Sequence, residues 1–145
     1  MNVFLDTSVL VAASAVSHPH HVRAFPLLRR VVAGRDKGFI STHSIAEVYA
    51  ALTRLPVQPR IHPAEAARMV TGNLLPHFTT VLVDKPDYLE ALRIVTDGGW
   101  AGAKIYDAIL LRCAAKSNAD RIYTFNLADF RLLAPRELVN KICAP

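Results

Sequence analysis

The chain has 145 residues, of which 52% are hydrophobic and 20% are charged, and its formal net charge is +5. This composition predicts one globular domain over residues 1–145 and excludes an intrinsically disordered chain. No apolar run reaches the roughly 18 residues of a membrane span, no N-terminal signal is visible and the two cysteines lack CxxC spacing, so we expect a cytoplasmic protein without membrane contact, disulfide framework or zinc ribbon.

Short apolar runs alternate with segments of helical pattern along the chain. In chain order we expect a strand at residues 2–5, a helix at 7–16, a turn at 17–21, a helix at 22–35, a strand at 37–42, a helix at 44–55 and a proline-rich loop at 56–63. The second half continues with a helix at 64–75, a strand at 78–83, helices at 86–98 and 105–117 and a strand at 121–125, and residues 137–144 form either a fifth strand or a tail. Because the strands are apolar runs with little polar–apolar alternation, the order of strands and helices predicts an α/β fold with a mainly parallel sheet of four to five strands between helices.

Polar side chains stand where these predicted strands end. Asp6 directly follows the first strand, Glu47 lies in the first turn of the helix after the second strand, and Asp107 lies in the first turn of the helix at 105–117. Asn126 and Asp129 follow the fourth strand. Because the carboxyl ends of parallel strands meet at one edge of a sheet, we expect these side chains to gather at the crevice there.

Each of these residues also has a purely structural interpretation. Asp6 is a good N-cap for the following helix, and Ser44 with Glu47 matches a capping box. Asp107 complements a helix dipole, and Asn126 suits an Asx-turn. Taken together, however, carboxylates gathered among apolar neighbours repel one another unless a cation compensates their charge. Oxygen ligands without histidine or cysteine select a hard cation, Mg²⁺ or Mn²⁺.

Three stretches of the chain carry a resemblance to a known family. The segments FLDTSVLVAA, STHSIAEVYAAL and IYDAILLRCAAKSNADRIYTFNLADF resemble the successive motifs of PIN-domain ribonucleases, and most of all the VapC-type toxins of bacterial toxin–antitoxin pairs. The resemblance implies a three-layer PIN-like fold and a Mg²⁺- or Mn²⁺-dependent endoribonuclease that hydrolyses RNA phosphodiester bonds. It also implies that Asp6, Glu47 and Asp107 are catalytic residues and metal ligands.

The fourth acidic position of the family falls in the stretch TFNLADF. This chain has Asn126 where many relatives carry an aspartate, and Asp129 follows it, so either residue can complete the catalytic and metal-binding set. The resemblance also implies that a hydroxyl group beside the first aspartate orients metal or water, which makes Ser8 and Thr124 candidate positioning residues.

The resemblance further implies partners for the chain. These are an RNA substrate, a cognate VapB-type antitoxin whose C-terminal segment places an arginine in the acidic pocket, and a second copy of the chain in a two-fold dimer. The mild excess of 17 Lys and Arg over 12 Asp and Glu also favours an anionic partner. Two alternatives stay open: a non-catalytic PIN-like module that binds RNA or protein, and a DNA-directed nuclease on the same fold.

Overall fold

The strands of the protein form one five-stranded sheet in a computed structural model that describes residues 1–145. The sheet order is β3-β2-β1-β4-β5, and every neighbouring pair is parallel. The strands are β1 (Asn2–Leu5), β2 (Lys37–Ser41), β3 (Phe78–Val81), β4 (Arg121–Tyr123) and β5 (Ile142–Cys143). The predicted parallel α/β sheet is therefore confirmed, with β1 at its centre.

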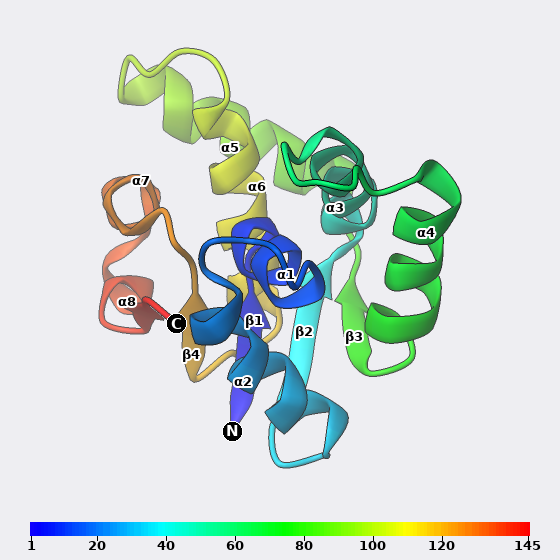
Figure 1. The fold of residues 1–145 in the computed structure, drawn as a ribbon. Helices are drawn as coiled ribbons and strands as arrows, with labels where there is room; N and C mark the ends of the chain where they lie inside the picture. The colour runs from blue at the N-terminus through cyan, green and yellow to red at the C-terminus, as the bar shows by residue number, and fades with distance from the viewer.

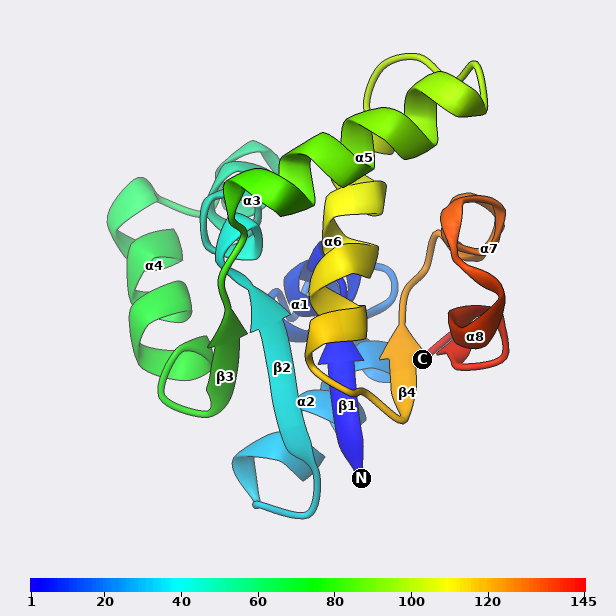
Figure 2. The same cartoon turned by 180° about the vertical axis from the view of Figure 1, so that it is seen from behind.

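Helices cover both faces of this sheet and make three layers (Figure 1). One face carries α1 (Thr7–Ser14), α2 (His21–Val32), α3 (Thr42–Arg54), α4 (Pro63–Arg68) and the π-helical turn η1 (Met69–Leu74). The opposite face, which Figure 2 shows from behind, carries α5 (Lys85–Asp97), α6 (Lys104–Lys116), α7 (Leu127–Leu133) and α8 (Arg136–Val139). None of these helices has both the length and the hydropathy needed to cross a membrane.

The central strand explains why apolar residues run through β1 without alternation. Val3 and Leu5 pack into the core on the α1 side, whereas Phe4 packs into the core on the α6 side. All three side chains are buried, since successive side chains of a strand point to opposite faces and both faces are covered. The two cores therefore fix the position of the carboxyl end of β1.

The carboxyl ends of three strands lie at one edge of the sheet. Phe4 of β1 is in register with Phe39 of β2, and Leu5 is in register with Tyr123 of β4. The residues that follow β1, β2 and β4 are thereby brought to the same edge, as the sequence predicted.

The structure differs from the sequence prediction mainly after β4. A short helix, α7, was not predicted, and residues 137–144 hold the end of α8 and only a two-residue strand, β5. The predicted helix at 64–75 is α4 continued by the π-helical turn η1. These short elements are set by their packing on the sheet, because they are too short for periodicity to identify.

Candidate active site

Asp6 lies at the end of β1 and is almost completely buried, with 4% of its surface exposed. Its side chain caps α1 by accepting the Ser8 backbone N–H at 3.2 Å, so the predicted N-cap is confirmed. The other carboxylate oxygen accepts the hydroxyls of Ser8, at 2.8 Å, and Thr124. Burial raises the pKa of Asp6, and the hydrogen bonds from Thr124 and Ser8 oppose that rise.

The hydroxyls of Ser8 and Thr124 link Asp6 to the segment that follows β4. Ser8 Oγ accepts the backbone N–H of Phe125 at 3.2 Å, and Thr124 Oγ1 accepts the backbone N–H of Asn126 at 2.9 Å. Both predicted positioning residues therefore contact the Asp6 carboxylate and also hold the neighbouring strand end in place.

The predicted capping box of Ser44 and Glu47 is wrong. Helix α3 is capped by Ser41, the last residue of β2, whose hydroxyl accepts the backbone N–H of His43 at 3.0 Å. Ser44 is buried inside the helix, and Glu47 lies in the second turn instead of the first. The cap lies three residues before the motif suggested, because the chain turns into the helix directly after β2 and the hydroxyl at the strand end is the one available.

Glu47 lies on α3, and its side chain is directed to the same edge as Asp6. Its Oε1 accepts the hydroxyl of Thr7 at 3.0 Å and lies 3.5 Å from Nε2 of His43. Burial raises the pKa of Glu47, His43 and Thr7 oppose that rise, and the charge of Asp6 adds to it. Sequence reasoning missed Thr7 and His43 as partners of Glu47, although their proximity to strand ends was a signal.

Asp107 lies in the first turn of α6, as predicted. Burial and, after it, the charges of Asp6, Asp129 and Glu47 together raise its pKa to about 7, while a hydrogen bond from Asn126 opposes the rise. Four carboxylates, one from the end of β1 and one each from α3, α6 and α7, therefore share one electrostatic environment.

Asn126 lies between two of these carboxylates. Its Nδ2 donates to Asp107 Oδ2 at 2.9 Å and to Asp129 Oδ2 at 3.1 Å, and its side chain does not cap α7. The ammonium of Lys104 donates to the other oxygen of Asp129 at 2.8 Å. The hydrogen bonds from Lys104 and Asn126 hold the pKa of Asp129 below its usual range. No sequence motif identified Lys104, which directly precedes the predicted helix at 105–117.

An open pocket of about 360 Å³ lies over these side chains. It is lined by Glu47, Ala101, Ala103, Lys104, Tyr106, Asp107, Asn126 and Asp129. As the side chains are arranged, no three acidic, histidine or cysteine residues lie close enough together to hold a metal ion. Each carboxylate is instead engaged by a neighbouring hydroxyl, amide or ammonium group.

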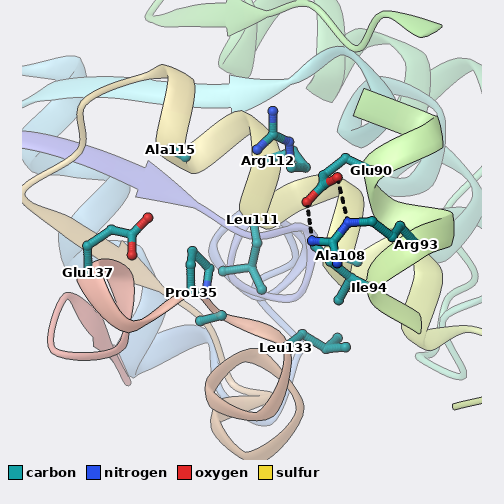
Figure 3. Close-up of a pocket in the computed structure, with 11 residues that line it drawn as sticks. Glu90, Arg93, Ile94, Ala108, Leu111, Arg112, Ala115, Leu133, Pro135 and Glu137 are labelled. Carbon is teal, nitrogen blue, oxygen red and sulfur yellow. Dashed lines mark hydrogen bonds and ion pairs between the residues drawn. The ribbon is translucent and has the colours of Figure 1, made fainter. Parts of the chain in front are cut away.

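A second pocket, of about 340 Å³, lies on the other side of α6 (Figure 3). It is lined mainly by apolar residues of α5, α6 and the segment joining α7 to α8, and its acid Glu90 accepts two hydrogen bonds from Arg93. The second acid, Glu137, lies on α8, away from the strand ends that carry Asp6 and Asp107. This pocket lacks the convergent carboxylates of the first one, so we place the candidate active site at the carboxyl edge of the sheet.

The fold and this edge define a three-layer α/β protein with an acidic pocket at the carboxyl ends of parallel strands. The sequence model described as "PIN domain" matches residues 3–134. The chain therefore belongs to the PIN domain family.

Relatives of known name support this assignment. The chain is 30% identical over 119 residues to "Ribonuclease VapC27" of Mycobacterium tuberculosis (strain H37Rv), and the match covers 80% of this chain and 79% of that protein. Its fold is similar to that of Mycobacterium tuberculosis VapC20, described as a sarcin-ricin loop cleaving toxin, with a TM-score of 0.67 and 21% identity over 88% of this chain and 92% of that one.

Two further solved structures share the fold at lower identity. Rickettsia felis VapBC2, bound to a DNA fragment from its promoter, has a TM-score of 0.62 at 16% identity, and the match covers 100% of this chain and 99% of that one. FitAB bound to the IR36 DNA fragment has a TM-score of 0.66 at 16% identity, covering 99% of this chain and 94% of that one.

Proposed function

We propose that the chain is an endoribonuclease toxin of the VapC type that hydrolyses RNA phosphodiester bonds. The observation that carries this proposal is the convergence of Glu47, Asp107 and Asp129 on one open pocket, with the buried charge of Asp6 close enough to help raise the pKa of Asp107 to about 7. Membership of the PIN domain family and the 30% identity to a ribonuclease support the same activity.

The activity requires Mg²⁺ or Mn²⁺, held by Asp6, Glu47, Asp107 and Asp129. This donor set fits a hard divalent cation, because it consists of carboxylate oxygens whose mutual repulsion a cation would relieve. When bound, such a cation lowers the pKa of water and stabilises negative charge on a phosphate.

The polar residues around the carboxylates position them. Ser8 and Thr124 hold the Asp6 carboxylate at the floor of the site through their hydroxyls. Asn126 keeps Asp107 and Asp129 together by donating to both. In this proposal water, and not the 2′-hydroxyl of the ribose, attacks the phosphorus, and the P–O3′ bond breaks. Hydrolysis therefore leaves a 5′-phosphate and a 3′-hydroxyl.

A direct test compares nucleic acids and metals. The protein is incubated with structured RNA, single-stranded DNA and duplex DNA, each with Mg²⁺, Mn²⁺ or EDTA. We expect cleavage of RNA alone, abolished by EDTA. Cleavage of DNA would favour a DNA-directed nuclease, and metal-independent binding without cleavage would favour a non-catalytic binding module.

The non-catalytic module is the second candidate, and two residues favour it. Asn126 stands where a fourth carboxylate would add charge, and Lys104 neutralises Asp129. Both reduce the net negative charge available to a cation. The test above separates this candidate from the first, since only the first predicts metal-dependent products.

A cognate VapB-type antitoxin holds the ribonuclease in check in this proposal. Similar folds occur in VapBC2 and FitAB. The acidic pocket attracts a guanidinium group, whose planar fork pairs bidentately with carboxylate, so we expect an antitoxin arginine to enter it. Co-expression with a neighbouring small gene should restore growth and give a stable complex, and replacing that arginine by alanine should weaken both.

A two-fold dimer of the chain is the remaining element of the proposal. Helix α5 exposes Leu89 and Leu92 to solvent by 55% and 48% of their surface. These leucines lie three residues apart on one helix, so in this proposal a second copy of the chain covers them. Light scattering after size-exclusion chromatography should give twice the mass of one chain.

A further inference from the structure

A stacked aromatic pair lies on the α3 side of the acidic pocket. The ring of Tyr106, the residue before Asp107, stacks on His43 with ring centroids 5.3 Å apart and planes 18° from parallel. Tyr106 lines the pocket and is 47% exposed, whereas only 22% of the His43 side chain is exposed. His43 Nε2 lies 3.5 Å from Glu47 Oε1. The histidine ring on which Tyr106 stacks is therefore held in place.

A second stacked pair lies on the β4 side. His20, in the turn before α2, stacks on Phe125 with centroids 4.7 Å apart and planes 22° from parallel. Phe125 packs against the core, and its backbone N–H is bound to Ser8, while His20 is exposed. The guanidinium of Arg23 lies 5.3 Å from the centroid of the Phe125 ring and adds positive charge at this place.

The two pairs lie on opposite sides of Asp6 along the edge of the sheet. His43 follows β2, Phe125 follows β4, and β1 with Asp6 lies between those strands. Neither pair carries a carboxylate ligand of the proposed metal, and in each pair one ring, that of Tyr106 or His20, is exposed. Aromatic and histidine side chains exposed beside a phosphate-processing site are the groups on which unpaired bases stack.

We propose that these pairs receive two unpaired nucleobases of RNA, one on Tyr106 and one on His20, so that the phosphate between them lies over Asp6 and Asp107. This inference rests on the proposed ribonuclease function and specifies its substrate class as an unpaired RNA segment. Paired bases are stacked on their neighbours and are not free to contact both rings. The cation Arg23 contacts the backbone beside the base on His20.

Binding of short RNA in EDTA tests this inference without requiring activity. Fluorescence anisotropy would compare labelled 12-nucleotide oligo(A), oligo(U), an abasic ribose-phosphate oligomer and an RNA duplex. We expect Tyr106→Leu and His20→Ala each to weaken oligo(A) binding about tenfold, in line with the loss of one base–aromatic stack. Weaker stacking by uracil predicts a smaller effect with oligo(U), and the abasic oligomer and the duplex should bind wild type and variants equally.

Matched variants separate stacking from changes in folding or charge. Tyr106→Phe keeps the ring and should bind as wild type does. Tyr49→Leu removes a tyrosine that is 40% exposed outside the pocket, and His77→Ala removes an exposed histidine outside both pairs, so neither should alter binding.

The outcomes for this inference differ from those for the proposed function. Equal oligo(A) affinity of wild type, Tyr106→Leu and His20→Ala would overturn the stacking proposal, even if the protein cleaves RNA in Mn²⁺. Stacking-dependent binding in a protein that cleaves no RNA would support the stacking proposal and reject the nuclease. In an active protein, the same two variants should raise KM about tenfold with little change in kcat.

Discussion

Asp6 serves both as a helix cap and as the most deeply buried carboxylate of the acidic pocket. The cap requires only an oxygen that accepts the Ser8 N–H, which an asparagine side chain also provides. The proposed metal site requires the negative charge. A single substitution therefore separates the two roles.

We expect Asp6→Asn to fold normally and to lose RNA cleavage by roughly 100-fold or more, as is common when a residue supporting a metal site is changed. Asn caps a helix about as well as Asp, so the melting temperature should change little. Calorimetry and an RNA cleavage assay with Mn²⁺ would be run side by side. An active Asp6→Asn protein would show that the residue is only a cap.

Asp129 and Asn126 are the two candidates for the fourth metal ligand. In the structure their side chains direct different chemical groups toward the other carboxylates. Asn126 directs its amide nitrogen, a donor, toward Asp107 and Asp129, whereas Asp129 has a charge that Lys104 partly offsets. We expect Asp129→Asn to weaken Mn²⁺ binding more than Asn126→Ala does, because Mn²⁺ and Mg²⁺ prefer charged oxygen ligands.

Isothermal titration of Mn²⁺ into the two variants measures this difference. We also expect Asn126→Asp to strengthen Mn²⁺ binding, since it adds a carboxylate within hydrogen-bond distance of Asp107. A larger loss of affinity in Asn126→Ala would reverse the ranking and make the asparagine the fourth ligand.

At the scale of elements, Gly38 allows β2 to pack closely against a side chain of β3 and one of α2. A Cβ atom there would lie 2.6 Å from the Phe78 ring of β3 and from a methyl group of Val31 on α2. We expect Gly38→Ala to lower the free energy of unfolding by about 1–3 kcal/mol through overpacking. Gly72→Ala is the matched control, because nothing lies within 4 Å of a Cβ at that position. Equal urea midpoints for the two variants would contradict this account.

Asp36 joins the end of α2 to the start of β2. Its buried carboxylate accepts two hydrogen bonds from Arg30, which hold the pKa of Asp36 below its usual range. A lowered pKa in the folded state means that the stabilisation is complete above the ordinary carboxyl pKa, about 4, and is lost as the pH falls through the folded value.

Asp36→Asn should accordingly lower the melting temperature at pH 7, and the difference from wild type should shrink as the pH falls below about 4. Thermal unfolding followed by circular dichroism between pH 7 and pH 3 measures it. Asp97→Asn serves as control, since that side chain is 64% exposed and should have little effect. A difference that stays constant with pH would show that the Asp36 charge is not responsible.

The first four strands and the longer helices could be predicted from the sequence, whereas the short helices after β4 could not. The first four strands and the helices α1, α3, α5 and α6 carry enough apolar residues for their pattern to show. Helices α7 and α8 have only seven and four residues, so tertiary packing determines whether they form. The capping box at Ser44 failed because a local motif does not reveal where the preceding strand ends.

At the scale of the whole molecule, the gathering of Asp6, Glu47 and Asp107 could be anticipated because parallel strands end at one edge. The partners of these carboxylates could not be anticipated. Lys104 and His43 come from different helices, and their contacts with Asp129 and Glu47 depend on the packing of complete side chains. Sequence motifs of a few residues do not identify such contacts between distant parts of the chain.

The central claim is that the acidic pocket uses a divalent cation to hydrolyse RNA. Mass spectrometry of RNA cleavage products with wild-type protein and Asp107→Asn, in Mn²⁺ and in EDTA, tests it most directly. We predict products with 5′-phosphate and 3′-hydroxyl ends from the wild-type protein in Mn²⁺ alone, and none from Asp107→Asn or in EDTA. Products ending in a 2′,3′-cyclic phosphate, or cleavage that survives EDTA, would contradict the account.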